Sequence, residues 1–182
     1  MKPETITKQI FKIIPALLLV TLSAFLLQGD VWTFWTWYLL ALVLGTAAIP
    51  LTGRLFRRFQ DRGWMFSKVT AIAVSGFLTW FLVAVKIIKF TTGTCIVVTL
   101  VCAAASLILY CREQKAGFEC IPFAHLDLVY AEELLFFTAF LLWTYFAGFH
   151  PAAYGTEKFM DYGFMEAMMR STTLPARDLW YS

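Results

Sequence analysis

Charge is scarce in this sequence, and its scarcity excludes several classes of protein. Only 15% of the 182 residues are charged and 60% are hydrophobic, whereas soluble domains carry roughly 25% charged residues. The formal net charge of +3 is modest, and membrane topology explains the clustering of basic residues better than a polyanion partner does. These features exclude a soluble enzyme, a nucleic-acid-binding domain and a disordered tail.

Cysteine and histidine patterns typical of metal sites are also missing. None of the four cysteines belongs to a C-x-x-C pair, so the spacing does not match a zinc site. Cys95 and Cys102 fall in an apolar run, where cysteine acts as a small hydrophobic residue. Cys111 and Cys120 fall in a loop expected on the cytoplasmic side, where thiols stay reduced. We therefore expect all four to be structural.

The sequence contains instead five long apolar runs. Each run lacks acidic residues in its interior, provided that Glu132 and Glu133 lie at the membrane edge of the fifth, and each is close to the ~20 residues that span a bilayer. This pattern predicts an all-α, polytopic transmembrane bundle of about five helices. The expected spans are residues 10–27, 31–51, 69–88, 94–110 and 130–149.

Basic residues indicate the orientation of the bundle. Twice as many lysines and arginines fall on the inner side as on the outer side when the N-terminus is inside, which is the positive-inside bias. We therefore expect an integral inner (plasma) membrane protein with a cytoplasmic N-terminus and residues 150–182 outside. The most basic loop most simply reflects topology, with an anionic-lipid patch as the alternative. Its basic residues are Arg54, Arg57, Arg58, Arg62 and Lys68, against one acid, Asp61.

The expected outer loop contains a pair of carboxylates. Residues 157–170 are predicted to form a surface helix, on which Glu157 and Asp161 lie four residues apart and share one face. Phe164 and Met168 continue the same stripe, an arrangement that suits a helix packed over a cavity with its acids in a partly desolvated site. The simpler interpretation is that the helix dipole favours an acid such as Glu157 in the first turn.

Further polar residues of the loop are candidates for substrate binding. Two of them also have simpler interpretations. His150 lies just past a helix end, where a histidine is often interfacial. Arg170 and Glu166 are spaced i, i+4, which matches a surface ion pair. Glu132 and Glu133 become candidates if the membrane boundary falls before them, since a buried acid is a functional-site hypothesis by default. The substrate-binding candidates of the loop are His150, Lys158, Arg170 and Asp178.

Several segments together resemble one family of membrane proteins. Residues 133–143 (ELLFFTAFLLW) and 155–164 (GTEKFMDYGF), with Asp178-Leu179-Trp180 and the upstream Pro50-Leu51-Thr52, look like the YYY-domain family of large bacterial and archaeal membrane proteins. The resemblance covers most of residues 39–182. Members of that family resemble multi-spanning glycosyltransferases that use lipid-phosphate-linked sugars, with an acidic motif on the first large outer loop.

The resemblance implies roles for the paired carboxylates. Glu157 and Asp161 would act as general base toward an acceptor hydroxyl, or as ligands of a divalent cation, Mg²⁺ or Mn²⁺, that steadies the departing phosphate. A polyprenyl-phosphate sugar would be the donor. Because the chain ends at Ser182, before the family's tyrosine-rich segment, we expect it to be an N-terminal portion that is inactive alone. The alternative is a non-catalytic membrane scaffold or subunit whose outer helix docks a membrane-protein partner.

Overall fold

The chain is all-helical. The computed structural model describes residues 3–120, 123–149 and 158–176, with side chains from Lys12 onward, and these ranges contain no β-strand. This confirms the all-α class that the apolar runs predict. The helices are α1 (Pro3–Leu27), α2 (Val31–Leu55), α3 (Trp64–Ala84), α4 (Thr92–Lys115), α5 (Leu126–Gly148) and α6 (Lys158–Arg170), with short 3₁₀ turns η1 (Gln28–Asp30) and η2 (Phe123–His125).

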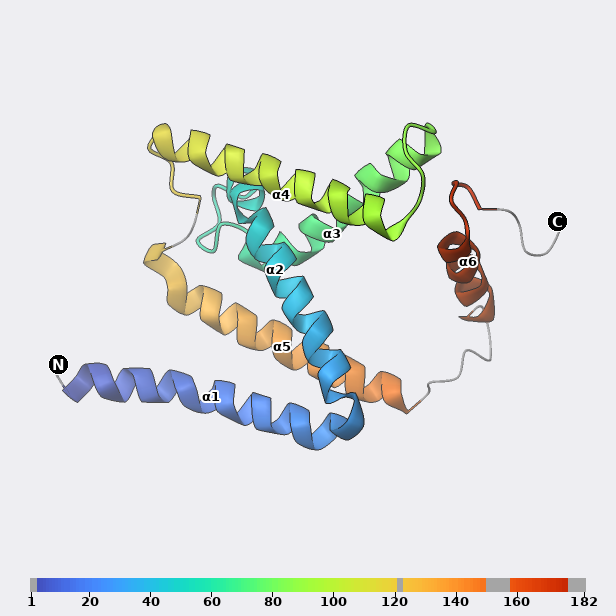
Figure 1. Cartoon of the computed structure of the whole chain (residues 1–182). Coiled ribbons are helices and arrows are strands. Elements are labelled where there is room, and N and C mark those ends of the chain that lie inside the picture. Colours follow the sequence, from blue (N-terminus) through green and yellow to red (C-terminus); the bar gives the residue numbers. More distant parts are fainter. Residues whose placement is uncertain (1–2, 121–122, 150–157, 177–182) are drawn as a thin grey trace.

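Three helical runs within the described residues are long and apolar enough to cross a membrane. They are Lys12–Leu55, Trp64–Ala84 and Thr92–Lys115. The first run contains both α1 and α2, and Figure 1 shows that the chain reverses sharply at η1 between them. Large apolar side chains on these runs face outward, with Leu18 62% and Leu100 62% exposed, as expected for helices whose surroundings are lipid.

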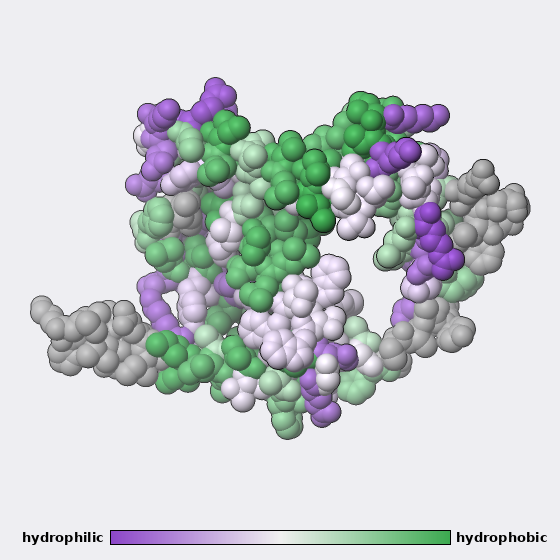
Figure 2. Space-filling model, in the orientation of Figure 1, coloured by the Kyte–Doolittle hydropathy of each residue, from purple (hydrophilic) through white to green (hydrophobic). Residues whose placement is uncertain are grey.

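The two ends of the bundle differ in charge. In Figure 1 the N-terminus and the α2–α3 and α4–α5 connections lie at the left, whereas η1 and the α3–α4 connection lie at the right. Figure 2 shows apolar side chains over the middle of the helices and hydrophilic ones gathered beside the C-terminal end of α4. We call the left side the basic end, because basic residues gather there, among them Arg54, Arg57, Arg58, Arg62, Arg112 and Lys115.

Helix α6 and the segment after it form an arm, residues 158–176, at the opposite end. The backbone N–H of Phe90, in the α3–α4 connection, donates a hydrogen bond to the carbonyl oxygen of Thr172 at 2.8 Å. Leu174 is buried, with 7% of its surface exposed. These contacts attach the arm to the end of the bundle that lacks the arginine-rich loop (Figure 1).

An aromatic core joins α2 to α5. Phe34 and Tyr38 of α2 pack against Phe137 and Leu141 of α5, and all four are buried. Each pair is spaced four residues apart, so each lies on one face of its helix. The rings of Tyr38 and Phe137 meet edge to face, with centroids 4.8 Å apart, a geometry that stabilises aromatic pairs by about 0.5–1.5 kcal/mol beyond burial.

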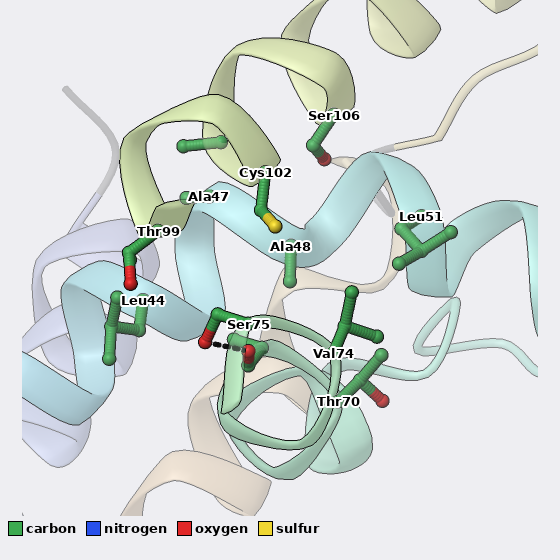
Figure 3. A pocket seen from close by; sticks show the side chains of 12 residues that line it. Leu44, Ala47, Ala48, Leu51, Thr70, Val74, Ser75, Thr99, Cys102 and Ser106 are labelled. Atoms are coloured by element: carbon green, nitrogen blue, oxygen red, sulfur yellow. Dashed lines mark hydrogen bonds between the residues drawn. The ribbon is translucent and has the colours of Figure 1, made fainter. Parts of the chain in front are cut away.

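Small side chains let α2, α3 and α4 cross closely. Figure 3 shows Ala48, Ser75 and Cys102 around a cavity between the three helices. The cavity measures only about 60 Å³ and is apolar, whereas ligand pockets measure roughly 300–1,000 Å³. The Ser75 hydroxyl donates to the carbonyl oxygen of Ala71 in its own helix. We interpret this region as helix packing of the small-residue type.

Candidate functional site

A buried ion pair links α3 to α5. The ammonium of Lys68 lies 2.6 Å from Oε2 of Glu133, and the two side chains are only 4% and 17% exposed. Lysine and glutamate are rarely buried unless they are paired. Charged residues inside a membrane protein are costly, and they commonly mark functional positions. This pair is therefore the starting point for a site.

Glu133 accepts hydrogen bonds from two other helices as well. The Tyr38 hydroxyl of α2 donates to Oε1 at 2.8 Å, and the Trp64 indole N–H of α3 donates to Oε2 at 2.9 Å. Hydrogen bonds to an ionised acceptor are roughly twice as strong as neutral ones. Glu133 therefore connects α2, α3 and α5 at a single carboxylate, and both of its oxygens are occupied.

Lys68 lies in a cage of aromatic rings and backbone. Its Nζ atom lies 4.5 Å from the ring centroid of Phe136 and 5.1 Å from that of Trp64, both within the range of a cation–π interaction. Its stem passes Gly45 of α2, where an added Cβ would lie 2.7 Å from Lys68 Cγ and 2.9 Å from Ser67 Oγ. Only a glycine leaves room for this side chain.

Two more carboxylates surround the pair. Glu132 interacts electrostatically with Asp61 and with Lys68, and its Oε2 atom is buried without a hydrogen-bond partner. Asp61, in the α2–α3 loop, is 6% exposed and accepts a hydrogen bond from the backbone N–H of Met65 at 3.3 Å. The cluster thus carries more carboxylates than cations.

The local sequence explains why these side chains converge. Glu133, Phe137 and Leu141 are four residues apart, so the carboxylate lies on the same buried face of α5 as the aromatic core. Helix α3 begins at Trp64 rather than at the predicted Val69, so Lys68 lies inside the helix and one turn beyond Trp64. The sequence alone predicts that Lys68 lies in the basic loop, and it makes Glu133 a candidate only if the membrane boundary falls before this residue. The four-residue spacing of Glu133 and Phe137 is the sequence feature that indicates a buried position for the Glu133 carboxylate.

The cluster is suited to holding α2, α3 and α5 together, because the Glu133 carboxylate bonds to side chains of the other two helices. Three donors from α2 and α3 already bind Glu133, whereas Oε2 of Glu132 has no hydrogen-bond partner. Over residues 3–120, 123–149 and 158–176, no group of three or more His, Cys, Asp or Glu is placed to hold a metal ion.

The structure describes three of the predicted loop residues. Lys158 begins α6, Asp161 lies in its first turn, and both are exposed. Arg170 pairs with Glu166 at 3.0 Å and is 82% exposed, which matches the simpler interpretation of a surface ion pair. The structure does not bring Asp161 into the buried cluster, because α6 lies at the other end of the bundle. The candidates His150, Glu157 and Asp178 lie outside the described residues.

The arm and α3 together line a second, mainly apolar hollow. Phe164 and Met168 of α6 line it together with Leu174 and with Trp80 of α3, and its volume is about 380 Å³. Asp161 lies one turn before Phe164 and belongs to the same stripe of the helix. Two residues of the predicted stripe, Phe164 and Met168, therefore line the hollow, and the third, Asp161, precedes them on the same face of α6.

These features define an all-helical membrane protein with a buried charge cluster and an amphipathic arm. Its apolar helices are suited to contact with the lipid bilayer. The uncharacterized membrane protein family DUF2298 matches residues 74–182, and the chain belongs to this family. The matched region runs from within α3 through α5 to the arm, so it includes Glu133 and Asp161. No curated protein and no solved structure matches the chain.

Proposed function

We propose that the chain belongs to a glycosyltransferase-like integral-membrane protein that uses a lipid-phosphate-linked sugar. The observation that supports it most is that Asp161, an exposed residue, lies one helical turn before Phe164, which lines the apolar hollow together with Met168 and Trp80. A polyprenyl-phosphate sugar has a polar head and a long apolar tail. An acid adjoining an apolar hollow offers surfaces for both.

In this proposal Asp161 and Glu157 form the acidic motif. One carboxylate accepts the proton of an acceptor hydroxyl; alternatively, the pair binds Mg²⁺ or Mn²⁺ together with the substrate's phosphate oxygens. Mg²⁺ sites commonly use only one or two carboxylates plus substrate phosphate, so the exposed Asp161 is compatible with such a role. His150, Lys158, Asp178 and Arg170 would contact the substrate, and the exposed guanidinium of Arg170 keeps donors beyond those that bind Glu166.

We further propose that the basic end faces the cytoplasm of an inner-membrane protein and that the arm lies outside. The opposite placement of the arginine-rich loop and α6 supports this orientation, because cytoplasmic loops carry an excess of basic residues. An impermeant thiol reagent on intact cells would test it. A cysteine replacing Ser171 should be labelled, and one replacing Gln60 should not; the reverse result would contradict the orientation.

The activity is tested in the full-length native protein, reconstituted with a polyprenyl-phosphate sugar and its acceptor. Asp161→Asn and Glu157→Gln should each lower the transfer rate by about 10²–10⁴-fold without changing membrane insertion. Glu166→Gln, on the same helix but engaged with Arg170, is the matched control and should retain activity. Unchanged transfer in both carboxamide variants would contradict the roles proposed for these acids.

A docking function is the second candidate. Met165 and Met169 of α6 are 57% and 76% exposed, and Tyr162 is 56% exposed, an apolar surface that suits a membrane-protein partner. Met165→Ser with Met169→Ser should then abolish recovery of a partner from solubilised membranes, whereas Asp161→Asn should not. Recovery that is insensitive to the methionine changes would contradict docking through this face.

A further inference from the structure

The basic end contains a cavity that neither the buried cluster nor the arm accounts for. Its volume is about 270 Å³, and it lies between the α2–α3 loop and η2. It is independent of the proposed sugar transfer, because the arm lies at the other end of the bundle. Its lining includes Arg57, Arg58 and Arg62, the rings of Phe59 and Phe123, and His125.

Two of the arginines are held in place before any ligand binds. The guanidinium of Arg57 lies 4.2 Å from the ring centroid of Phe118 and 3.1 Å from a carboxylate oxygen of Glu113. Arg62 stacks over the same ring at 4.9 Å and donates to the carbonyl oxygen of Arg57. The backbone of Arg62 has a left-handed φ of 54°, which is uncommon for a residue other than glycine. The loop is thus shaped to keep both guanidinium groups together.

Arg58, the third arginine that lines the cavity, has free hydrogen-bond donors. No hydrogen bond or ion pair involves the Arg58 side chain within the described part of the chain, and this side chain is exposed. Glu113 is shared between Arg54 and Arg57, and Glu119 is the acid that lines the cavity. Four arginines against these two glutamates leave an excess of positive charge.

The rim of the cavity is apolar. Phe59 and Phe123 both line it, and they are 54% and 62% exposed. Aromatic side chains beside basic residues are typical of the membrane–water interface. A free phosphate would gain nothing from these rings, whereas a lipid would place its headgroup on the arginines and its glycerol and upper chains against the aromatic side chains.

We propose that this cavity binds the phosphodiester headgroup of an anionic phospholipid. Arg58 supplies the free donors, Arg57 and Arg62 supply charge from fixed positions, and His125 adds a polar group at the η2 side. Arginine forks match phosphate oxygens with two parallel hydrogen bonds. Basic clusters of this kind recognise anionic headgroups at the cytoplasmic surface.

The test is native mass spectrometry of the full chain in detergent, titrated with phosphatidylglycerol or phosphatidylcholine. Phosphatidylglycerol should bind more tightly than phosphatidylcholine. Arg58→Gln should weaken phosphatidylglycerol binding about tenfold, the effect of losing one charged hydrogen bond, and should leave phosphatidylcholine binding unchanged. Arg112→Gln is the matched control, because Arg112 lies at the same end, is exposed and does not line the cavity; its effect should stay within about twofold.

Three outcomes would overturn the proposal. Equal losses in the Arg58 and Arg112 variants would show a general charge effect, and no loss in either would show that the cavity does not bind the headgroup. The third outcome is that inorganic phosphate displaces phosphatidylglycerol at equal concentration. This result would identify free phosphate, and not the lipid headgroup, as the ligand. Phe59→Ser supplies a further check, since it should weaken phosphatidylglycerol binding with all the arginines still in place.

Discussion

Gly45 of α2 lies directly against the buried stem of Lys68 of α3. A Cβ atom on Gly45 would be 2.7 Å from Lys68 Cγ, well inside the ordinary contact distance. Lys68 cannot turn aside without leaving Glu133, whose carboxylate is its ion-pair partner at 2.6 Å. The close helix contact and the buried charge therefore depend on each other.

Gly45→Ala should destabilise the bundle by about 1–3 kcal/mol, because overpacking a rigid contact costs this much. Thermal unfolding in detergent would show it as a lowered midpoint. Gly76→Ala is the matched control, since Gly76 is also helical but an added Cβ there would meet nothing within 4 Å. That variant should be neutral or slightly stabilised. Equal shifts in the two variants would contradict the contact.

Breaking the Lys68–Glu133 pair from one side should cost more than removing both charges. Lys68→Met alone, or Glu133→Gln alone, leaves a buried charge without its partner, which typically costs about 3–5 kcal/mol. The double variant should recover part of that loss. Denaturation of the four proteins in mixed micelles measures the coupling.

The control for this cycle is the exposed pair of Arg170 and Glu166. Arg170→Gln should change stability by no more than about 0.5 kcal/mol, because surface ion pairs contribute little. If the losses of the two single variants at Lys68 and Glu133 simply add in the double variant, the pair is not coupled and the proposed structural role is wrong.

The apolar runs predicted much of the fold because helix length and hydropathy are local properties. The start of α3 could not be predicted in the same way. Lys68 looks like a loop residue in sequence, since its charge interrupts the apolar pattern. The group that compensates this charge, Glu133, lies in another helix far along the chain, so only the tertiary arrangement shows that Lys68 is buried.

The arm shows the same division between local and tertiary information. The stripe formed by Asp161, Phe164 and Met168 follows from helical periodicity alone and could be read from the sequence. The hollow that the stripe adjoins needs Trp80 of α3 and Leu174 beyond α6, and no periodicity brings these residues together. The cavity at the basic end was likewise foreseen only as a charge run, because its shape depends on how Arg57 and Arg62 stack on Phe118.

Cys120 should react slowly with alkylating reagents. Its side chain is buried, with 1% of the residue exposed. Burial raises the pKa of the Cys120 thiol, and the negative charge of Glu113 adds to this rise. A raised pKa leaves less thiolate at a given pH, and the thiolate is the reactive form.

Iodoacetamide at pH 7.5 followed by mass spectrometry would test this prediction. Cys111 is the internal comparison, because it is exposed. It should be modified first, and the rate at Cys120 should increase as the pH is raised. Faster modification of Cys120 than of Cys111 would contradict the burial of this thiol.

Leu174 should control how firmly the arm is attached. It is 7% exposed and lines the hollow beside Trp80, so Leu174→Ser should weaken docking by about 2 kcal/mol. The fraction of molecules with an undocked arm would then rise about thirtyfold. Trypsin cleavage after Arg170 should speed up in proportion, because proteolysis tracks the population of the open form when opening and closing are fast.

The control variant is Met169→Ser, at a 76% exposed position of α6, which should leave the cleavage rate unchanged. Equal cleavage rates in the wild-type and Leu174 proteins would contradict docking through this residue.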